Sequence, residues 1–216
     1  KLLLTAETGW VEETGATEIK AKDDADITGT SISRTDTAGD VLAVTGNLDF
    51  DGTAGNITIA ALGAANFGSL TFNTTGDVSI SEDDAMVVTG VNTASSQILI
   101  AEVGSITDAS DADITIAGNA SFTANGVGGA ITIGDDANNV DAFDTLTFNT
   151  TGDVSISEDN AMVVTGVNTA AILLLMSESG SSDASGASSI MSTAVSALMG
   201  TAISITTIPG RLQADT

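Results

Sequence analysis

The chain contains a long internal copy of itself. Residues 70–94 read LTFNTTGDVSISEDDAMVVTGVNTA, and residues 146–170 repeat this segment 76 positions later with one difference, Asn160 in place of Asp84. Self-similarity at a fixed long period, carried by strand-like pieces, is typical of solenoids, in which each unit is stable because it stacks on its neighbours. The copy therefore predicts one continuous rod over residues 1–216. Rods of this kind usually have a structural role and do not catalyse a reaction.

Short segments of alternating apolar and polar residues, such as ITI, LTF and VSI, recur along the whole chain. Because successive side chains of a strand point to opposite faces, we expect the apolar residues inside and the Ser and Thr residues outside. Two-residue Asn-Gly and Asp-Gly hairpin turns are scarce, which favours parallel coils over antiparallel hairpins. In the two copies the pattern points Ser79 and Ser155 outward. It points the apolar residues of the same segments inward, namely Val78, Ile80, Val154 and Ile156.

The phenylalanines follow the copy as well, and each one in the first half has a counterpart in the second. This pairing predicts stacked core side chains rather than an exposed aromatic platform. The pairs are Phe50 with Phe122, Phe67 with Phe143, and Phe72 with Phe148.

The spacing of the segments predicts the number of coils. With two strands to a coil, successive coils begin 16 to 23 residues apart, which suits a parallel β-helix whose coils stack about 4.8 Å apart. Dividing the chain by the mean step gives about ten coils, with about four in one full repeat such as residues 96–171. The first copy carries an extra coil or insertion at residues 10–31, which holds the only Trp of the chain, Trp10.

Residues 187–216 depart from the strand pattern and are expected to form an irregular C-terminal end or cap. Between Ile190 and Met199 the apolar residues recur at helical spacing, which predicts a short C-terminal helix. The same segment aligns with the strand-bearing residues 114–122, which predicts a strand instead. Both alternatives remain open for residues 188–199.

The composition excludes several classes of function. The formal net charge is -24, there is no Cys or His, and no Lys or Arg occurs between Thr35 and Gly210. Thiol and imidazole chemistry are therefore absent, and the chain lacks the basic residues with which proteins bind nucleic acid or an anionic membrane surface. No apolar stretch approaches the roughly 18 residues that insertion into a membrane requires. Such an acidic chain with a regular apolar pattern suits a secreted or cell-surface protein.

Two kinds of sequence piece together resemble a known family. The piece GNASFTA at residues 118–124 alternates with strands such as ITIG and DVSIS. These pieces are similar to the β-strand repeats of large secreted bacterial adhesins related to filamentous haemagglutinin, and the likeness covers most of the chain. The resemblance implies a right-handed parallel β-helix, an extracellular location, and a structural role in a surface adhesin or filament.

Acidic residues cluster in the turns and are candidate ligands for weak Ca²⁺ sites, since Ca²⁺ binds about six to eight oxygen atoms. The glycine-rich nonapeptide of calcium-binding β-rolls and the EF-hand spacing are both missing. Solvated turn acids are therefore the favoured interpretation, and we expect no cofactor apart from this weakly bound Ca²⁺. The candidate ligands lie in three pairs: Asp49 and Asp51, Asp83 and Asp84, Asp135 and Asp136.

No catalytic residues are recognised, and we expect a protein that is not an enzyme. Polysaccharide-cleaving enzymes combine acids with basic residues or set two carboxylates across a sugar, whereas the acids here lie in copied turns. The alternative function is a carbohydrate-binding or ice-binding module built on outward threonines. Thr is also common on any solvent-facing strand. Candidate outward threonines are Thr58, Thr71, Thr115 and Thr132.

The chain begins at Lys1, directly before the segment LLL and without a recognisable signal peptide. We expect either a removed leader or a longer polypeptide. A coil at the end of a solenoid exposes unpaired N–H and C=O groups that can pair with another strand. The expected partners are a second copy stacked end to end, or the rest of a longer chain, and in addition surface glycans. The residues expected to make the self-association contact are Leu2, Leu3, Leu4, Trp10, Ile203 and Ile205.

Overall fold

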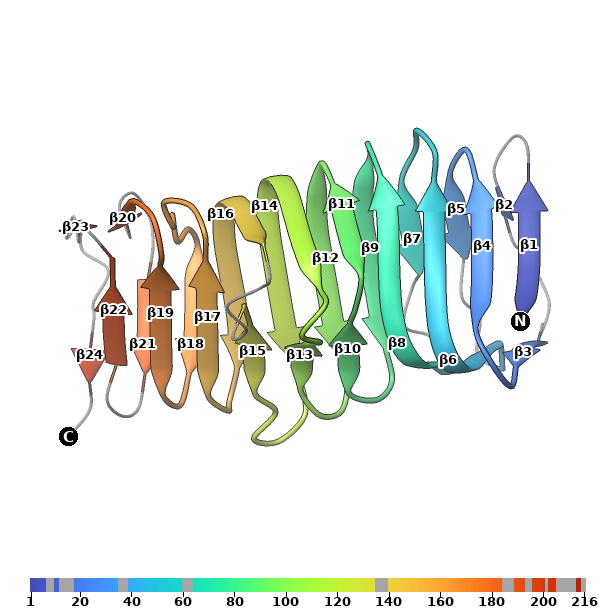
Figure 1. Cartoon of the computed structure of the whole chain (residues 1–216). Coiled ribbons are helices and arrows are strands. Elements are labelled where there is room, and N and C mark those ends of the chain that lie inside the picture. The colour runs from blue at the N-terminus through green and yellow to red at the C-terminus, as the bar shows by residue number, and fades with distance from the viewer. Residues whose placement is uncertain are drawn as a thin grey trace.

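The structure is a computed structural model, and it describes residues 1–6, 10–11, 18–34, 39–59, 64–134, 140–183, 189–192, 196–200, 202–204 and 213–214. Within these residues the chain is all-β, contains no helix and forms a parallel β-solenoid (Figure 1). The strands lie side by side along a rod, with β1 and β24 at opposite ends. The prediction of an all-β parallel solenoid is confirmed.

The strands up to Glu82 form three faces of the rod. The first face contains β1 (Leu2–Ala6), β4 (Ala25–Gly29) and the second halves of β6 (Val41–Gly52) and β8 (Ala64–Thr74). The second face contains β2 (Trp10–Val11), β5 (Ile32–Arg34), β7 (Ile57–Ile59) and β9 (Asp77–Glu82). The third face contains β3 (Glu18–Ala21) and the first halves of β6 and β8. Strands β6 and β8 therefore each turn a corner between two faces.

Beyond β8 the first face continues as two ladders. One contains β10 (Met86–Val88), β13 (Ile106–Asp108), β15 (Ile131–Ile133), β17 (Val154–Glu158), β19 (Leu173–Ser177) and β22 (Ser196–Met199). The other contains β11 (Val91–Ala94) and the first halves of β14 (Asp113–Ala124) and β16 (Asp141–Thr150).

The second face continues from β9 through β12 (Ser96–Ala101) to the second halves of β14 and β16. It then passes to β18 (Val167–Ala170), β21 (Ser189–Ser192) and β24 (Gln213–Ala214). A separate two-stranded sheet contains β20 (Ser181–Asp183) and β23 (Ala202–Ser204).

The rod has about seven turns, which can be followed along the ladder from β4 through β6, β8, β10, β13, β15 and β17 to β19. The expected number of about ten coils is corrected. That number came from dividing the whole chain by a mean step, so it counted every residue before Ala25 and after Ser177 as part of a complete coil. Outside these bounds lie several segments that are not among the described residues.

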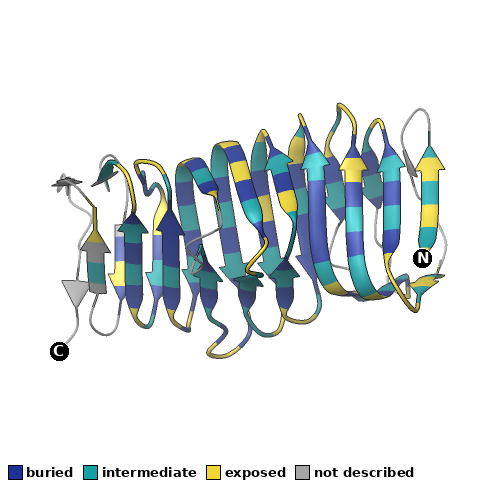
Figure 2. Cartoon of the chain, viewed as in Figure 1, coloured by how far each residue is buried: buried dark blue, intermediate teal, exposed yellow. Residues whose placement is uncertain are grey.

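The core is a column of apolar side chains that runs through the turns. Figure 2 shows buried positions alternating with partly exposed ones along the strands. In register, Phe50 lies next to Phe72 and Phe122 next to Phe148, and all six phenylalanines are buried. The predicted inward and outward residues of the two VSI segments are confirmed, because Val78, Ile80, Val154 and Ile156 are buried and Ser79 and Ser155 are partly exposed.

The two copies do not lie on the same face. Leu70 pairs with Leu48 and Val88, whereas its copy Leu146 pairs with Ala120 and Val164, which belong to the ladder that continues the second face. The cause is a short coil in each copy: the step from Leu70 to Val88, or from Leu146 to Val164, is 18 residues. Other steps reach 27 residues, as from Ile114 to Asp141. The repeat therefore does not equal four whole coils.

The C-terminal helix prediction is wrong. Residues 188–199 contain β21 and β22, which add to the edges of β18 and β19. Along β21, Ile190 and Ser192 are buried while Met191 is exposed, which is the alternation of a strand. Helical spacing of apolar residues was a weaker signal than the preformed edge, because a strand that adds there gains its hydrogen bonds and buries its apolar face at once.

Candidate functional site

In each short coil one strand is missing, so the last strand of one ladder, the first half of β8 or of β16, has an edge with no strand beside it. We call the place of each missing strand a notch. The first notch is formed by Ala65, Phe67, Glu82 and Asp83, and the second notch by the copied positions Asp141, Phe143, Glu158 and Asp159. In both notches the Glu that ends β9 or β17, together with the Asp directly after it, meets the first half of β8 or β16. The two notches are therefore equivalent sites on different faces.

Acidic side chains hydrogen-bond the exposed edge in place of a strand. In the first notch the Phe67 N–H donates to Glu82 Oε1 at 2.9 Å, and the Ala65 N–H donates to Asp83 Oδ2 at 2.9 Å. One backbone bond remains, from the Asp83 N–H to the Ala65 carbonyl at 2.9 Å. These bonds satisfy N–H groups that a neighbouring strand would otherwise have satisfied.

The second notch repeats this pattern with slightly shorter bonds. The Phe143 N–H donates to Glu158 Oε1 at 2.7 Å, and the Asp141 N–H donates to Asp159 Oδ2 at 2.7 Å. The Asp159 N–H donates to the Asp141 carbonyl at 2.8 Å. Because the geometry is copied with the sequence, the Glu-Asp pair has a defined role as a cap that ends one ladder.

Glu82 and Glu158 are each only 1% exposed, and the second oxygen of each, Oε2, has no hydrogen-bond partner among the described residues. Burial raises the pKa of Glu82 to about 8, and nearby Asp84 and Asp83 add to this against the opposing effect of the Phe67 N–H. Burial likewise raises the pKa of Glu158 to about 7. Burial therefore moves the pKa of both acids to neutral pH or above it, whereas an exposed Glu is ionised at pH 7.

Asp141 adds a third acid of this kind, in the second notch alone. It is buried, and burial together with the charge of Asp108 raises its pKa to about 8. The position corresponds to Ala65 in the first notch, so the second notch is the more acidic of the two at its base.

A surface depression lies over each notch, with a volume of about 270 Å³ at the first and about 530 Å³ at the second. The single difference between the copied segments, Asp84 against Asn160, falls in the lining of these depressions. Their equivalent lining residues include Asn66, Phe67 and Asp84 at the first and Ala142, Phe143 and Asn160 at the second. The described lining offers hydrogen-bond acceptors and amides, and it contains no base or thiol.

Where a face splits into two ladders, both copies contain the same pair of residues, a glycine with positive φ and a buried Asn. Gly90 and Gly166 have φ values of +66° and +71°, a backbone region that favours glycine. Two residues later, Asn92 and Asn168 are fully buried. The Asn92 and Asn168 Oδ1 atoms accept hydrogen bonds from the N–H groups of Phe72 at 2.9 Å and Phe148 at 2.8 Å.

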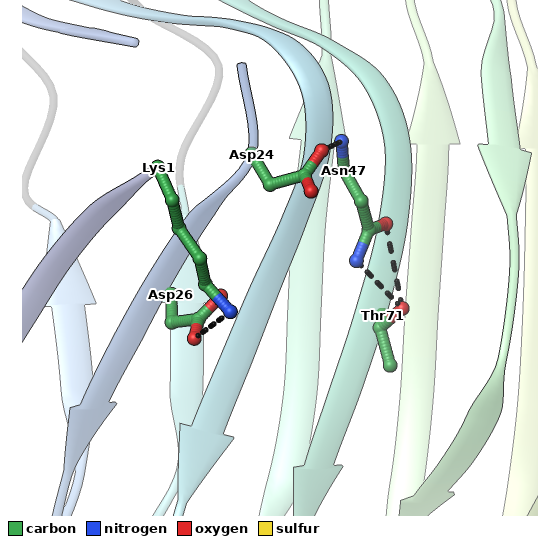
Figure 3. A network of polar contacts seen from close by, with 5 residues as sticks. All are labelled: Lys1, Asp24, Asp26, Asn47 and Thr71. Carbon is green, nitrogen blue, oxygen red and sulfur yellow. Dashed lines mark hydrogen bonds and ion pairs between the residues drawn. The ribbon is translucent and has the colours of Figure 1, made fainter.

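On the outer surface of the rod, a polar network links three successive coils (Figure 3). The Asn47 N–H donates to Asp24 Oδ1 at 3.0 Å, and Asn47 Nδ2 donates to Thr71 Oγ1 at 3.1 Å. Beside it, Lys1 Nζ forms an ion pair with Asp26 at 2.8 Å. The network fastens the corner of β6 to its neighbours above and below.

The structure places the predicted Ca²⁺ ligands in separate coils. Asp49 and Asp51 lie on β6, where burial and the charge of Asp26 raise the pKa of Asp49. Asp83 is used as a cap, and Asp84 is exposed in the same turn. Among the described residues, no three acidic side chains form a group that could hold a metal ion. Two further candidates, Asp135 and Asp136, lie outside the described residues.

The predicted self-association residues fall at both ends of the rod. Leu2, Leu3 and Leu4 lie on β1, and Leu3 is 65% exposed. Trp10 lies on β2 and Ile203 on β23, in positions whose side chains are not described. Ile205 lies outside the described residues.

The outward threonines do not form one uninterrupted array. The column that contains Thr58 continues with Ser79 and then Ile98, so an apolar residue follows within two coils. The aromatic side chains that the structure describes are the six buried phenylalanines. They offer no exposed ring on which a sugar could stack.

Comparisons with protein families, with characterised proteins and with solved structures found no match to this chain. A search of the described residues for a helix with the length and apolarity to cross a bilayer found none. The fold and the notches are therefore the observations on which a function has to be argued.

The capping role of Glu82 and Glu158 was missed when the turn acids were interpreted as solvated. A signal for it exists in the alternation itself. In VSISE the inward positions are those of Val78, Ile80 and Glu82, so the Glu falls on the core side of the strand. An acid at an inward position is rarely buried without a partner, and this indicates a specific acceptor role.

Proposed function

We propose that this chain is a stiff structural segment of a secreted or cell-surface adhesin or extracellular filament, wound as a right-handed parallel β-helix. The observation that supports this best is a single 22-stranded sheet of parallel strands around a continuous apolar core. Bending or shearing such a rod would break hydrogen bonds between coils and separate stacked side chains. The role needs no catalytic residue and no cofactor.

The partner we propose is the same kind of coil, either from a second copy stacked end to end or from the rest of a longer polypeptide. The edge of β1 that faces away from β4 has no partner strand among the described residues. Its N–H and C=O groups can accept a strand by β-augmentation, and exposed Leu3 adds an apolar contact. The charge of -24 opposes side-by-side clumping.

Electron microscopy of the native material tests the structural role. We expect thin rods or filaments, or rod-shaped parts of a larger surface protein. Short isolated particles in native material would contradict the proposal.

Light scattering on the isolated 216-residue chain tests the end-to-end version separately. We expect a mass that rises with concentration, and Leu3→Glu on β1 should reduce it. The matched control is Val127→Glu, because Val127 is a fully exposed apolar residue in a turn far from β1. A monomer at every concentration would remove stacking and leave continuation into a longer chain.

A further inference from the structure

Glu158 occupies a place where a carboxylic acid controls the end of a sheet. Its side chain lies at an inward position of β17 and is 1% exposed. Oε1 accepts the Phe143 N–H at 2.7 Å, and Oε2 has no hydrogen-bond partner among the described residues. The acid thus fills the acceptor position of a missing strand, at the point where the ladder β11–β14–β16 stops.

Among the described residues, the second notch offers no positive charge to an ionised Glu158. The sequence has no Lys or Arg between Thr35 and Gly210. A carboxylate that ionises in such a buried site is left without a counter-ion, which is costly unless it moves into water. The charged groups that face Glu158 or its neighbour Asp141 come from β13, β14, β16 and the turn after β17, and all are acidic: Asp108, Asp113, Asp144 and Asp159.

We propose that Glu158 is a proton-operated latch, which closes the edge of β16 while it carries its proton and releases the Phe143 N–H when it ionises. The side chain sits at the last residue of β17, directly before the turn at residues 159–160. Rotation of the Glu158 side chain about its own torsion angles can move the carboxylate outward while its backbone stays paired with Ser177 of β19. Opening uncovers the Phe143 N–H at the edge of β16, to which an added strand can pair.

The direction of the pH effect follows from the two states of the latch. In the closed state burial raises the pKa of Glu158 from 4.5 to about 7, and in the open state the acid regains its ordinary value. Between these values the closed form holds a proton that the open form releases. The equilibrium constant for opening therefore rises about tenfold per pH unit and levels off above the pKa of the closed form. Closure is complete at low pH and is lost as the pH rises through neutrality.

Amide hydrogen exchange, measured by NMR on the full chain between pH 5 and pH 8, tests the latch. The matched control is in the same strand, since the Phe148 N–H donates to Asn168 Oδ1 at 2.8 Å and Asn does not titrate. After correction for the intrinsic exchange rate, protection of the Phe143 amide should fall about tenfold per pH unit up to about pH 7. Protection of the Phe148 amide should change only as much as the free energy of global unfolding does, which urea denaturation at the same pH values measures.

The variant Glu158→Gln keeps an acceptor oxygen and removes this titration, so protection of Phe143 should then follow that of Phe148 at every pH. A second measurement needs no variant: the carboxyl carbon shift of Glu158 in the unmodified chain should titrate with a midpoint near 7. A midpoint near the ordinary value for Glu would overturn the proposal. So would a Phe143 amide that follows Phe148 at every pH in the unmodified chain, or a Gln variant that keeps the fall in protection.

Discussion

Replacement of the buried amide of Gln97 is expected to stabilise the rod. Gln97 lies on β12 and is 0% exposed, and neither its amide nitrogen nor its amide oxygen has a hydrogen-bond partner among the described residues. In register it lies between Val78 and Ala120, whose side chain is small. At the copied position the chain has Leu173, which is also buried. The core therefore already accepts Leu at an equivalent inward site.

The size of the effect follows from the cost of an unpaired buried amide, which is about 1–3 kcal/mol in protein interiors. Gln97→Leu removes this cost and keeps nearly the same side-chain volume, so the free energy of unfolding should rise by about 1–3 kcal/mol. For a chain of this length each kcal/mol raises the melting temperature by about 2–4 °C. Urea denaturation followed by circular dichroism measures the gain, with an unchanged m-value.

The reverse substitution at the copied site is the matched control. Leu173→Gln puts an amide into a buried inward position and should lower the free energy of unfolding by about 2–4 kcal/mol. A Gln97→Leu variant that is no more stable than the unmodified chain would refute the reasoning. That result would mean that the Gln97 amide is hydrogen-bonded inside the rod, for example through a buried water molecule.

Three further predictions concern the copied devices. Asn168→Ala leaves the buried Phe148 N–H without its acceptor and should lower the free energy of unfolding by about 1–3 kcal/mol in urea denaturation; no loss would contradict the role given to this hydrogen bond. Gly152→Ala would place a Cβ 2.3 Å from a backbone oxygen of the neighbouring coil, so it should lower the melting temperature, whereas outward Ser155→Ala should not. Burial raises the pKa of both Glu82 and Asp141 to about 8, above their ordinary values, so stability that is present at acidic pH should be lost as the pH rises toward 8. Urea midpoints measured from pH 5 to pH 8 check this, and a flat profile in the unmodified chain would contradict it.

The architecture was predictable because the alternation of apolar and polar residues determines which side of each strand faces the core. A period of two residues fixes which side chains enter the core, and the scarcity of hairpin turns selects parallel coiling. Buried Val78 and Ile80 and partly exposed Ser79 follow directly from this rule. Such statements need only local sequence, and the structure confirms them.

The relation between the copies was not predictable from the same pattern. Copying fixes the side chains of a segment, but its face is set by the number of residues in each preceding coil. The 18-residue steps after Leu70 and Leu146 omit one strand each, and nothing in the alternation marks the omission. The register with a preceding coil is a long-range property, which single-sequence patterns do not contain.

The candidate site was only partly visible in the sequence. Glu82 and Glu158 belong to acidic clusters that suit solvated turns. Only their position, two residues after an inward Ile in the segment VSISE, indicates that they face the core. Their hydrogen bonds reach back 15 residues, to Phe67 and Phe143. A contact of this kind depends on which strand ends nearby, and this is known only after the coils have been placed.

The central claim is that the coils stack in parallel in the register described, and engineered disulfides test it most directly. The chain has no Cys, so pairs can be introduced without competition. Thr132 and Ser155 are outward neighbours in register on β15 and β17, at a spacing of about 4.8 Å between coils that a disulfide can bridge. Thr132→Cys combined with Ser155→Cys should form an intramolecular disulfide readily. Ser79→Cys with Ser155→Cys, the two copied positions, should not, and a disulfide in this second pair or none in the first would contradict the account.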